Sequence, residues 1–176
     1  HSASEVATPA ERAVAFWERA RGHAETFNAG REGAFVRLDA ALQEINSGRD
    51  GAFGWAGAEI GFRLPPGVDP YELAAALAPS DDAQVEASGH ELAYVAGRDT
   101  TASRALRGAI RAQGGQPRFV HKTGTSDMNV VGPVWYCPIA AYGPGDSALD
   151  HTPDEHIDLD EYLRAIAVLT DALGRM

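Results

Sequence analysis

Two histidines and three carboxylates lie within seven residues, from position 150 to position 156. Imidazole and carboxylate are the groups that zinc and similar metals favour as ligands, so this segment predicts a metal site. The carboxylates of Asp154 and Glu155 have a second explanation, because acidic residues stabilise the amino-terminal end of a following helix. His151 precedes that helix and does not share this explanation, which makes it the candidate ligand.

Residues 122–129 form a second polar cluster, which joins hydroxyl groups and a glycine to the expected start of a helix. Lys122, Gly124, Thr125 and Ser126 would present hydrogen-bond donors that suit a carboxylate or a phosphate. Lys122 is the only lysine in the chain, and this isolation favours a role in a pocket. An ordinary helix cap formed by Ser126 or Asp127 explains the same residues equally well.

A third candidate is the glycine-rich loop at positions 142–147, which contains Gly145 and Ser147 and follows a predicted strand. Glycine in such a loop lets the backbone approach a ligand closely. The spacing is not that of a nucleotide-binding loop. The loop alone therefore predicts ligand contact without a ligand class.

The elements that must position these clusters fall into two parts. Residues 1–98 predict a ferredoxin-like α+β layer, a small antiparallel sheet with two helices on one face. The expected elements are a helix from Pro9 capped by Thr8, strands at 40–45 and 54–64 around a turn at 46–51, a helix at 71–77 opened by Asp69 and Pro70, and a strand at 83–95. The missing edge strand would precede His1.

Residues 99–176 predict an α/β part in which helices and strands alternate, as at one edge of a larger sheet. We expect a helix to about residue 113 capped by Asp99 or Thr100, a helix at 127–134, strands at 117–121 and 137–142, and a last helix from Asp158 with Glu161 as its capping box. The side chains expected on the core face of that last helix are Leu159, Tyr162, Leu163, Ile166, Leu169 and Leu173.

Composition limits the partners and the compartment. The chain has 25 acidic and 15 basic residues, and a net charge of -10 repels phosphate backbones, so nucleic acid is not an expected partner. No stretch approaches the roughly 18 apolar residues of a membrane span, so no membrane association is expected. A single cysteine, Cys137, excludes an internal disulfide and suits a reducing cytoplasm.

Taken in order, residues 123–129, Pro138, residues 142–146 and residues 151–155 resemble the last third of the M20 metallopeptidase and deacylase family. The run 122–129 is most similar to the branch that frees lysine or ornithine from an amino-group carrier protein, or deacetylates the acetylated amino acid. The resemblance implies a lid and dimerisation domain over residues 1–98. It implies the carboxyl-terminal part of a zinc-peptidase-like α/β catalytic domain over residues 99–176.

In such enzymes two zinc or cobalt ions share a water molecule, and a glutamate acts on it as general base. The resemblance implies that His151 ligates one of the metals and that Glu155 steadies its loop. The residues that match substrate-binding positions are Gly124, Thr125 and Ser126 in a turn and Gly145 and Ser147 in the glycine-rich loop.

Two residues of the first part are assigned by the same resemblance. His1 matches a histidine that reaches into the active site of the other subunit and polarises the scissile carbonyl, although a cloning remnant would leave the same residue. Arg63 matches an arginine that binds the substrate carboxylate with bidentate geometry, and a surface arginine at a sheet edge is its alternative. Lys122 receives no firm role from the resemblance.

The family's amino-terminal His-x-Asp metal motif, its bridging aspartate and its Glu-Glu pair have no counterpart in these residues. We therefore expect a fragment, inactive alone, of a dimeric amide hydrolase of lysine or arginine biosynthesis. It would use Zn²⁺ or Co²⁺ on an N-acyl amino acid or a carrier-linked one. The alternatives are acetylornithine deacetylase, succinyl-diaminopimelate desuccinylase, or a non-catalytic ferredoxin-like dimerisation module. The same motifs upstream of His1 would exclude the module.

Overall fold

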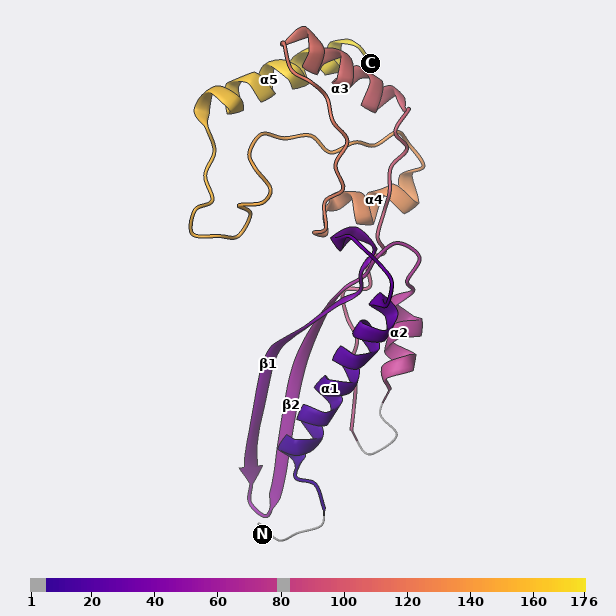
Figure 1. Ribbon diagram of the computed structural model, residues 1–176, viewed down its shortest axis with the longest axis vertical. Coiled ribbons are helices and arrows are strands. Elements are labelled where there is room, and N and C mark those ends of the chain that lie inside the picture. The colour runs from indigo at the N-terminus through magenta and orange to yellow at the C-terminus, as the bar shows by residue number, and fades with distance from the viewer. Residues whose placement is uncertain (1–5, 79–82) are drawn as a thin grey trace. The chain divides into compact units, whose positions relative to one another are not determined.

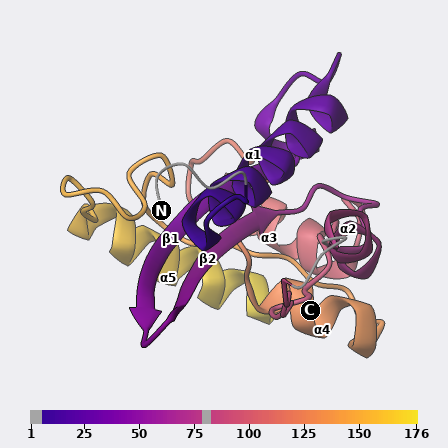
Figure 2. The ribbon, with the colours of Figure 1, turned by 90° about the horizontal axis from the view of Figure 1, so that it is seen from below.

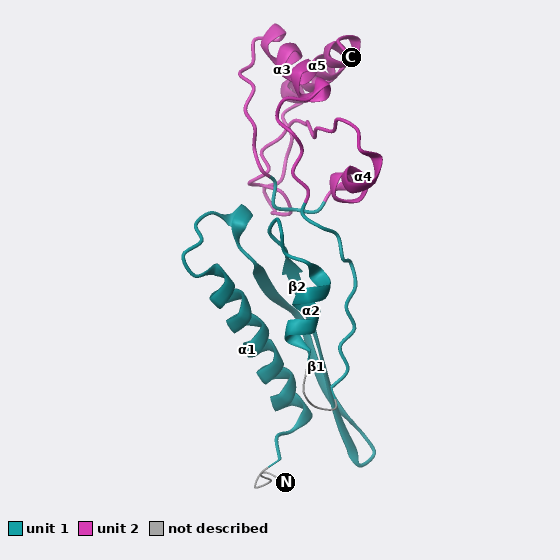
Figure 3. Cartoon of the chain, turned by 90° about the vertical axis from the view of Figure 1, so that its right-hand side faces the viewer, with its two compact units in different colours: residues 1–93, 122–125 teal, residues 94–121, 126–176 magenta. Residues whose placement is uncertain are grey.

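The computed structural model describes residues 6–78 and 83–176. It is a mixed α/β structure, and its elements are labelled in Figure 1. The chain divides into two compact units, the first made of residues 1–93 and 122–125 and the second of residues 94–121 and 126–176 (Figure 3). Within the described ranges, no helix combines the length and the apolar character that crossing a membrane requires.

The first unit opens with helix α1 (Pro9–Asn28), whose start is fixed by a reciprocal cap. The Glu11 amide donates to Thr8 Oγ1 at 3.2 Å, and the Thr8 amide donates to the Glu11 carboxylate at 2.7 Å. Pro9 occupies the first helical position, where its missing N–H leaves no intrahelical bond unmade. The predicted cap and helix start are confirmed.

The strands β1 (Asp39–Asp50) and β2 (Phe53–Arg63) form an antiparallel hairpin against which α1 lies (Figures 1 and 2). The loop between them has two residues, and the first of these, Gly51, has a φ of 57°. Such a glycine suits the two-residue turns whose twist matches that of the flanking strands. The pairing register shifts between Leu42 and Glu44, which is a β-bulge in β1.

The turn predicted at residues 46–51 is correct only at Gly51, because β1 continues to Asp50 and the turn lies at residues 51 and 52. The physical reason lies on the opposite strand. Gly48 pairs directly with Trp55, and a Cβ atom on Gly48 would lie 2.9 Å from the Trp55 ring. The glycine leaves room for the indole to cover the strand, and the indole supplies the packing that the glycine lacks.

Helix α1 packs on the hairpin, and a second α-helix of the first unit shares a buried core with it. Asp69 caps the second helix, α2 (Pro70–Leu77), and its carboxylate accepts from the Tyr71 amide at 2.7 Å, as predicted. The core shared by the two helices and the entry to β1 consists of Ala20, Ala24, Leu38, Leu73 and Leu77. The side chains that pack around it from the strands include Ala40, Ile60 and Phe62.

Replacing Thr8 with alanine is expected to lower the free energy of unfolding of the first unit by about 1 kcal/mol, because the Glu11 amide loses its acceptor. The bonds from the Thr8 backbone amide and then its hydroxyl hold the Glu11 pKa below its usual value of 4.5. A lowered carboxyl pKa stabilises the fold above the unfolded pKa, and this contribution disappears as pH falls through the folded pKa. The difference between the two proteins should therefore shrink in acid.

Urea unfolding at neutral and acid pH measures this difference. The matched control is Thr26→Ala in the same helix, where the hydroxyl donates to the Gly22 carbonyl and caps nothing. That substitution is expected to change stability by a few tenths of a kcal/mol at most, because alanine is the better helix former. Equal losses at Thr8 and Thr26 would contradict the assigned cap.

The second unit is built on α3 (Thr101–Ala112) and α5 (Leu159–Gly174), which pack against each other (Figure 3). Thr100 caps α3 and Asp158 caps α5, both at the predicted positions. The buried contact between the helices consists of Ala105, Ala109, Val168 and Ala172, with Leu106, Ile110 and Tyr142 packed around it. Small side chains therefore let the two helices approach closely.

The predicted core face of α5 is wrong. The structure buries Ala165, Val168 and Ala172, whereas the large apolar side chains of the helix are exposed. We call this exposed set the α5 stripe: Leu159, Tyr162, Leu163, Ile166, Leu169 and Leu173. Pattern reading favours the larger side chains for the core, and here α3 packs against the face that carries the smaller ones. A helix with apolar residues on both faces is typical of one that is buried on two sides.

Three further predicted strands are not found. In the described residues, 83–95, 117–121 and 137–142 are extended segments without strand pairing, and the paired strands are β1 and β2. A strand exists only where a neighbouring strand bonds its backbone amides and carbonyls. The described part of the chain supplies no such neighbour for these three segments. The assignment of residues 1–98 to a lid and 99–176 to a catalytic domain stays a prediction.

Candidate active site

His151 lies in the loop that leads into α5, and its backbone is unusual. Its φ is 64°, in the left-handed region that a residue with a Cβ atom seldom adopts. The His151 amide donates to Glu155 Oε2 at 2.8 Å, which holds this geometry in place. The contact agrees with the expectation that Glu155 steadies the loop. The imidazole of His151 is exposed.

Short bonds around His151 build the loop as a series of turns. The Ala148 amide donates to the Asp146 carboxylate at 2.9 Å, and both the amide and the hydroxyl of Thr152 donate to the Leu149 carbonyl, at 3.0 and 2.7 Å. His156 Nδ1 lies 2.7 Å from the Asp154 carbonyl oxygen. The His156 ring is thus hydrogen-bonded within its own loop.

The glycine-rich loop is tied to α5 by a contact that the sequence did not predict. The Gly145 amide donates to Glu161 Oε1 at 3.2 Å, and Gly145 has a φ of 96°. Glu161 therefore does not complete the expected capping box, although the Asp158 carboxylate does accept from its amide at 2.8 Å. A glutamate three residues after an N-cap suggests a local role, so the sequence held no signal for this longer contact.

Tyr142 opens the same loop and packs against the core of the second unit. Burial raises the pKa of its phenol above its usual value of 10.0, and the negative charge of Glu161 raises it further, while Arg164 acts in the opposite direction. The hydroxyl therefore stays protonated and can donate a hydrogen bond throughout the neutral range. Glu161 thus connects the glycine-rich loop, the phenol and α5.

The described residues do not bring the donors of a complete metal site together. A zinc site needs at least three protein ligands at coordination distance. Residues 6–78 and 83–176 contain no group of three or more His, Cys, Asp or Glu side chains that could hold a metal ion. The His151 imidazole is free to bind, but the Glu155 carboxylate beside it already accepts a backbone amide. These residues fit one ligand position and not a complete site.

Ser126 is the N-cap of α4 (Asp127–Trp135), so the helix-cap explanation of the second cluster accounts for it. The Ser126 amide donates to Asn129 Oδ1 at 2.9 Å. Inside α4, a Cβ atom on Gly132 would lie 2.6 Å from the Tyr94 ring, so the glycine allows the helix to pack closely there. Substrate binding by Ser126 stays a prediction.

The remaining candidates are divided between the two units. Lys122, Gly124 and Thr125 are exposed residues of the first unit, whereas Gly145, Ser147 and His151 belong to the second. The structure therefore brings Gly145, Ser147 and His151 into one loop. His1 lies outside the described residues.

Arg63, at the end of β2, already has partners. Its guanidinium forms an ion pair with Asp39 and donates to the Ala34 carbonyl at 3.0 Å. Arg63 thus connects the end of β2 to the first residue of β1 and to Ala34, which precedes β1. A substrate carboxylate would have to replace the Asp39 carboxylate at this arginine, so its predicted role requires that exchange.

Comparison with known proteins adds the family context. The model of Peptidase family M20/M25/M40 matches residues 6–175. A protein of Deinococcus radiodurans named [LysW]-lysine hydrolase is 47% identical over 100% of this chain and 50% of its own length. One of Sulfurisphaera tokodaii named [LysW]-lysine/[LysW]-ornithine hydrolase is 41% identical over 40% of this chain and 20% of its own length. The chain spans about half the length of the relative that it matches throughout.

Proposed function

The chain belongs to Peptidase family M20/M25/M40, and from this membership we propose that it is part of a metal-dependent amide hydrolase that releases lysine or ornithine from a carrier protein. The observation that carries the proposal is the 47% identity to a [LysW]-lysine hydrolase over 100% of this chain. Mere membership of a peptidase family would leave the substrate class open. The substrate is therefore inferred from this relative.

Within the proposed enzyme, residues 1–98 form a ferredoxin-like lid and dimer surface, and residues 99–176 form part of the catalytic domain. The α5 stripe supports this division. Burying one leucine contributes about 2 kcal/mol, so a surface of six large apolar side chains is costly to leave in water. The rest of the catalytic domain would cover the stripe and pair with the extended segments at 117–121 and 137–142.

His151 is the proposed metal ligand of this chain, and the other ligands come from outside it. A bound divalent metal would supply a polarised water for attack on the amide carbonyl. Glu155 holds the His151 backbone, and Glu161 holds the glycine-rich loop, so both act as positioning residues. Gly145 and Ser147 would line the pocket, and the turn at 124–126 with Lys122 would contact the substrate. Arg63 would bind the substrate carboxylate, and His1 would act in the other subunit.

The carrier-linked amino acid is the proposed substrate because the relatives' names specify it. Lysine and ornithine both end in a free cationic amine after release. The isolated chain of 176 residues should hydrolyse neither substrate, since one imidazole does not bind the metals or supply the general base. Metal-dependent amide hydrolysis by the isolated chain would contradict the proposal that the other metal ligands and the general base lie outside it.

The decisive experiment uses the complete enzyme that contains this sequence, loaded with Zn²⁺ or Co²⁺. Carrier-linked lysine, N-acetyl-lysine, N-acetylornithine and N-succinyl-diaminopimelate are offered in parallel, and carrier-linked lysine is expected to have the highest kcat/KM. Chelation of the metal should abolish the rate, and added metal should restore it. If N-acetylornithine or the succinyl compound has the highest kcat/KM, that compound is the substrate and carrier-linked lysine is not.

In the same enzyme, His151→Asn is expected to lower kcat/KM about 100-fold or more and to reduce bound metal, because one ligand is lost. Asparagine tolerates the left-handed backbone of this position, so the loop should keep its shape. His156→Asn is the matched control in the same loop and should change kcat/KM by less than about threefold. Unchanged metal content in the His151 variant would exclude the assigned ligand.

A further inference from the structure

Positive charge is concentrated in one part of this acidic chain. Residues 94–121 contain five arginines and one acidic residue, Asp99, whereas the whole chain carries a net charge of -10. On α3, Arg104, Arg107 and Arg111 occupy positions opposite the face that Ala105 and Ala109 bury against α5. The basic residues therefore lie on the side of α3 that faces away from its helical partner.

Two of these arginines converge on one aromatic ring. The guanidinium carbons of Arg98 and Arg107 lie 5.7 and 5.8 Å from the centre of the Phe119 ring. Phe119 is 48% exposed and the following Val120 is 77% exposed. We call Arg98, Arg107, Phe119 and the neighbouring Arg111 and Arg118 the arginine surface. The two guanidinium groups carry the same charge and repel each other. An anion that binds between them would relieve this repulsion.

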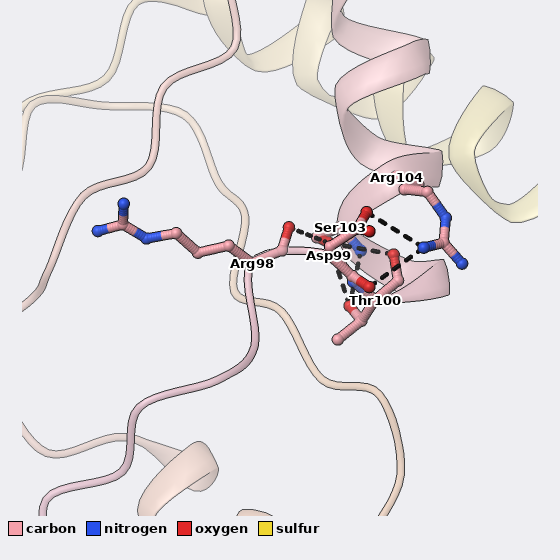
Figure 4. Close-up of polar contacts among 5 residues, drawn as sticks. All are labelled: Arg98, Asp99, Thr100, Ser103 and Arg104. Atoms are coloured by element: carbon pink, nitrogen blue, oxygen red, sulfur yellow. Dashed lines mark hydrogen bonds and ion pairs between the residues drawn. The ribbon is translucent and has the colours of Figure 1, made fainter.

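The base of this surface is held rigidly. The buried Ser103 hydroxyl lies 2.8 Å from the Arg98 carbonyl oxygen, to which it donates, and the Ser103 amide donates to the Thr100 hydroxyl at 3.2 Å. Figure 4 shows that the Arg98 side chain extends away from these contacts. The backbone at Arg98 is therefore positioned without any use of its guanidinium, which leaves the charged group available for a ligand.

The one nearby acid does not neutralise the arginine surface. Asp99 pairs with Arg104 at 3.1 Å, on the other side of the chain from the Arg98 guanidinium (Figure 4). At the end of α5, Asp171 pairs with Arg175. Among the residues that the structure describes, no acidic side chain forms an ion pair with Arg98, Arg107, Arg111 or Arg118.

We propose that the arginine surface is a docking site for an acidic polypeptide segment. Guanidinium groups bind carboxylates with bidentate geometry, and the arginines of α3 lie on the side of the helix that faces away from α5. A nucleic acid fits less well, because its negative charge extends beyond the arginine surface and is repelled by the many acidic residues of the chain. Screening confines the attraction to about 10 Å, the reach of a short segment.

The identity of the partner rests on the proposed function, and under it the acidic segment belongs to the carrier protein that delivers the amino acid. The surface would then hold the carrier while its linked lysine or ornithine enters the active site. Such docking contributes to binding of the carrier-linked substrate and not to the chemical step. It would therefore act on KM and leave kcat unchanged.

The binding experiment uses the 176-residue chain and a fluorescent peptide of about ten residues that is rich in glutamate and aspartate. We expect binding that weakens as salt rises, and the double variant Arg98→Gln and Arg107→Gln should bind about tenfold more weakly or worse. Arg31→Gln is the matched control, because Arg31 also stacks on a phenylalanine, Phe27, at 4.1 Å, but in the first unit. It should bind the peptide normally.

Three outcomes of this experiment would overturn the docking site: no peptide binding by the unaltered chain, an equal loss in the Arg31 variant, or equally tight binding of a single-stranded DNA oligonucleotide. Arg107→Lys in the same titration tests the guanidinium itself, since lysine keeps the charge without the bidentate geometry. It should bind more weakly than the unaltered chain and more tightly than the double variant.

A kinetic experiment with the complete enzyme tests the partner. The double variant should raise KM for carrier-linked lysine about tenfold at unchanged kcat, while both constants for N-acetyl-lysine stay the same. An unchanged KM for the carrier-linked substrate would overturn the carrier as partner. If the unaltered enzyme cleaved neither substrate, the proposed function would fail, and the peptide titration would still decide the docking site.

Discussion

Truncation of Leu38 to alanine should lower the free energy of unfolding of the first unit by about 3 kcal/mol. Leu38 is 1% exposed and contacts a core to which α1 and α2 both contribute. Its backbone is fixed as well, because the Asn28 side chain donates to the Leu38 carbonyl at 2.8 Å and accepts from its amide at 2.9 Å. The backbone therefore cannot shift to fill the cavity that the shorter side chain leaves.

Guanidinium unfolding followed by Trp17 fluorescence measures this loss. Trp17 packs against the same core, and replacing Trp55 and Trp135 with phenylalanine makes it the only reporter. The matched control is Leu92→Ala in the same unit, where the side chain is half exposed and the expected loss is below about 1 kcal/mol. Equal losses at both leucines would contradict the position of the core.

The second large effect is expected in α5, where Val168→Asp should cost about 3 to 5 kcal/mol in the isolated chain. Val168 is 2% exposed, and it contacts a core of alanines that offers no partner for a carboxylate. Leu163→Asp on the exposed stripe should change stability by about 0.5 kcal/mol or less, because Leu163 is 61% exposed. The apolar pattern of the sequence alone predicts the opposite ranking.

Amide hydrogen exchange of α3 and α5 distinguishes the two substitutions, since only Val168→Asp should unprotect both helices. The complete enzyme provides a second comparison. If the rest of the proposed catalytic domain covers the α5 stripe, Leu163→Asp becomes strongly destabilising there while it stays harmless in the isolated chain. A harmless Leu163→Asp in both proteins would exclude the stripe as the contact surface.

Helix starts were the part of the fold that the sequence predicted well, because each depends on a few neighbouring residues. Thr8, Asp69, Thr100 and Asp158 all cap the helices expected to follow them. A cap side chain bonds an amide two or three residues away, so the signal and the structure occupy the same short window. Distant parts of the chain have little influence on such a bond.

Strands and core faces were predicted less well, because they depend on distant partners. Gly48 looks like a turn residue until Trp55 is known to lie across from it. The core face of α5 is decided by α3, which packs against Ala165, Val168 and Ala172. Large apolar residues mark surfaces that must be buried, but they do not say which surface finds its partner within these residues.

In the candidate site too, a short-range contact was predicted and a long-range one was not. The contact between the His151 amide and Glu155 spans four residues and agrees with the expected role of Glu155. The bond from Gly145 to Glu161 spans sixteen residues and was not predicted. Residue type and order were sufficient to point to the loop, whereas the residues that hold it in shape became visible only in three dimensions.

At position 151, the residue that best suits the left-handed backbone differs from the residue that would bind a metal. Glycine would relax this position by about 1 kcal/mol, since it lacks the Cβ atom that causes the steric cost at histidine. Selection for a more stable protein would therefore favour losing the imidazole. A library of variants screened only for thermal stability should enrich glycine at position 151, and the same library screened for turnover should keep histidine.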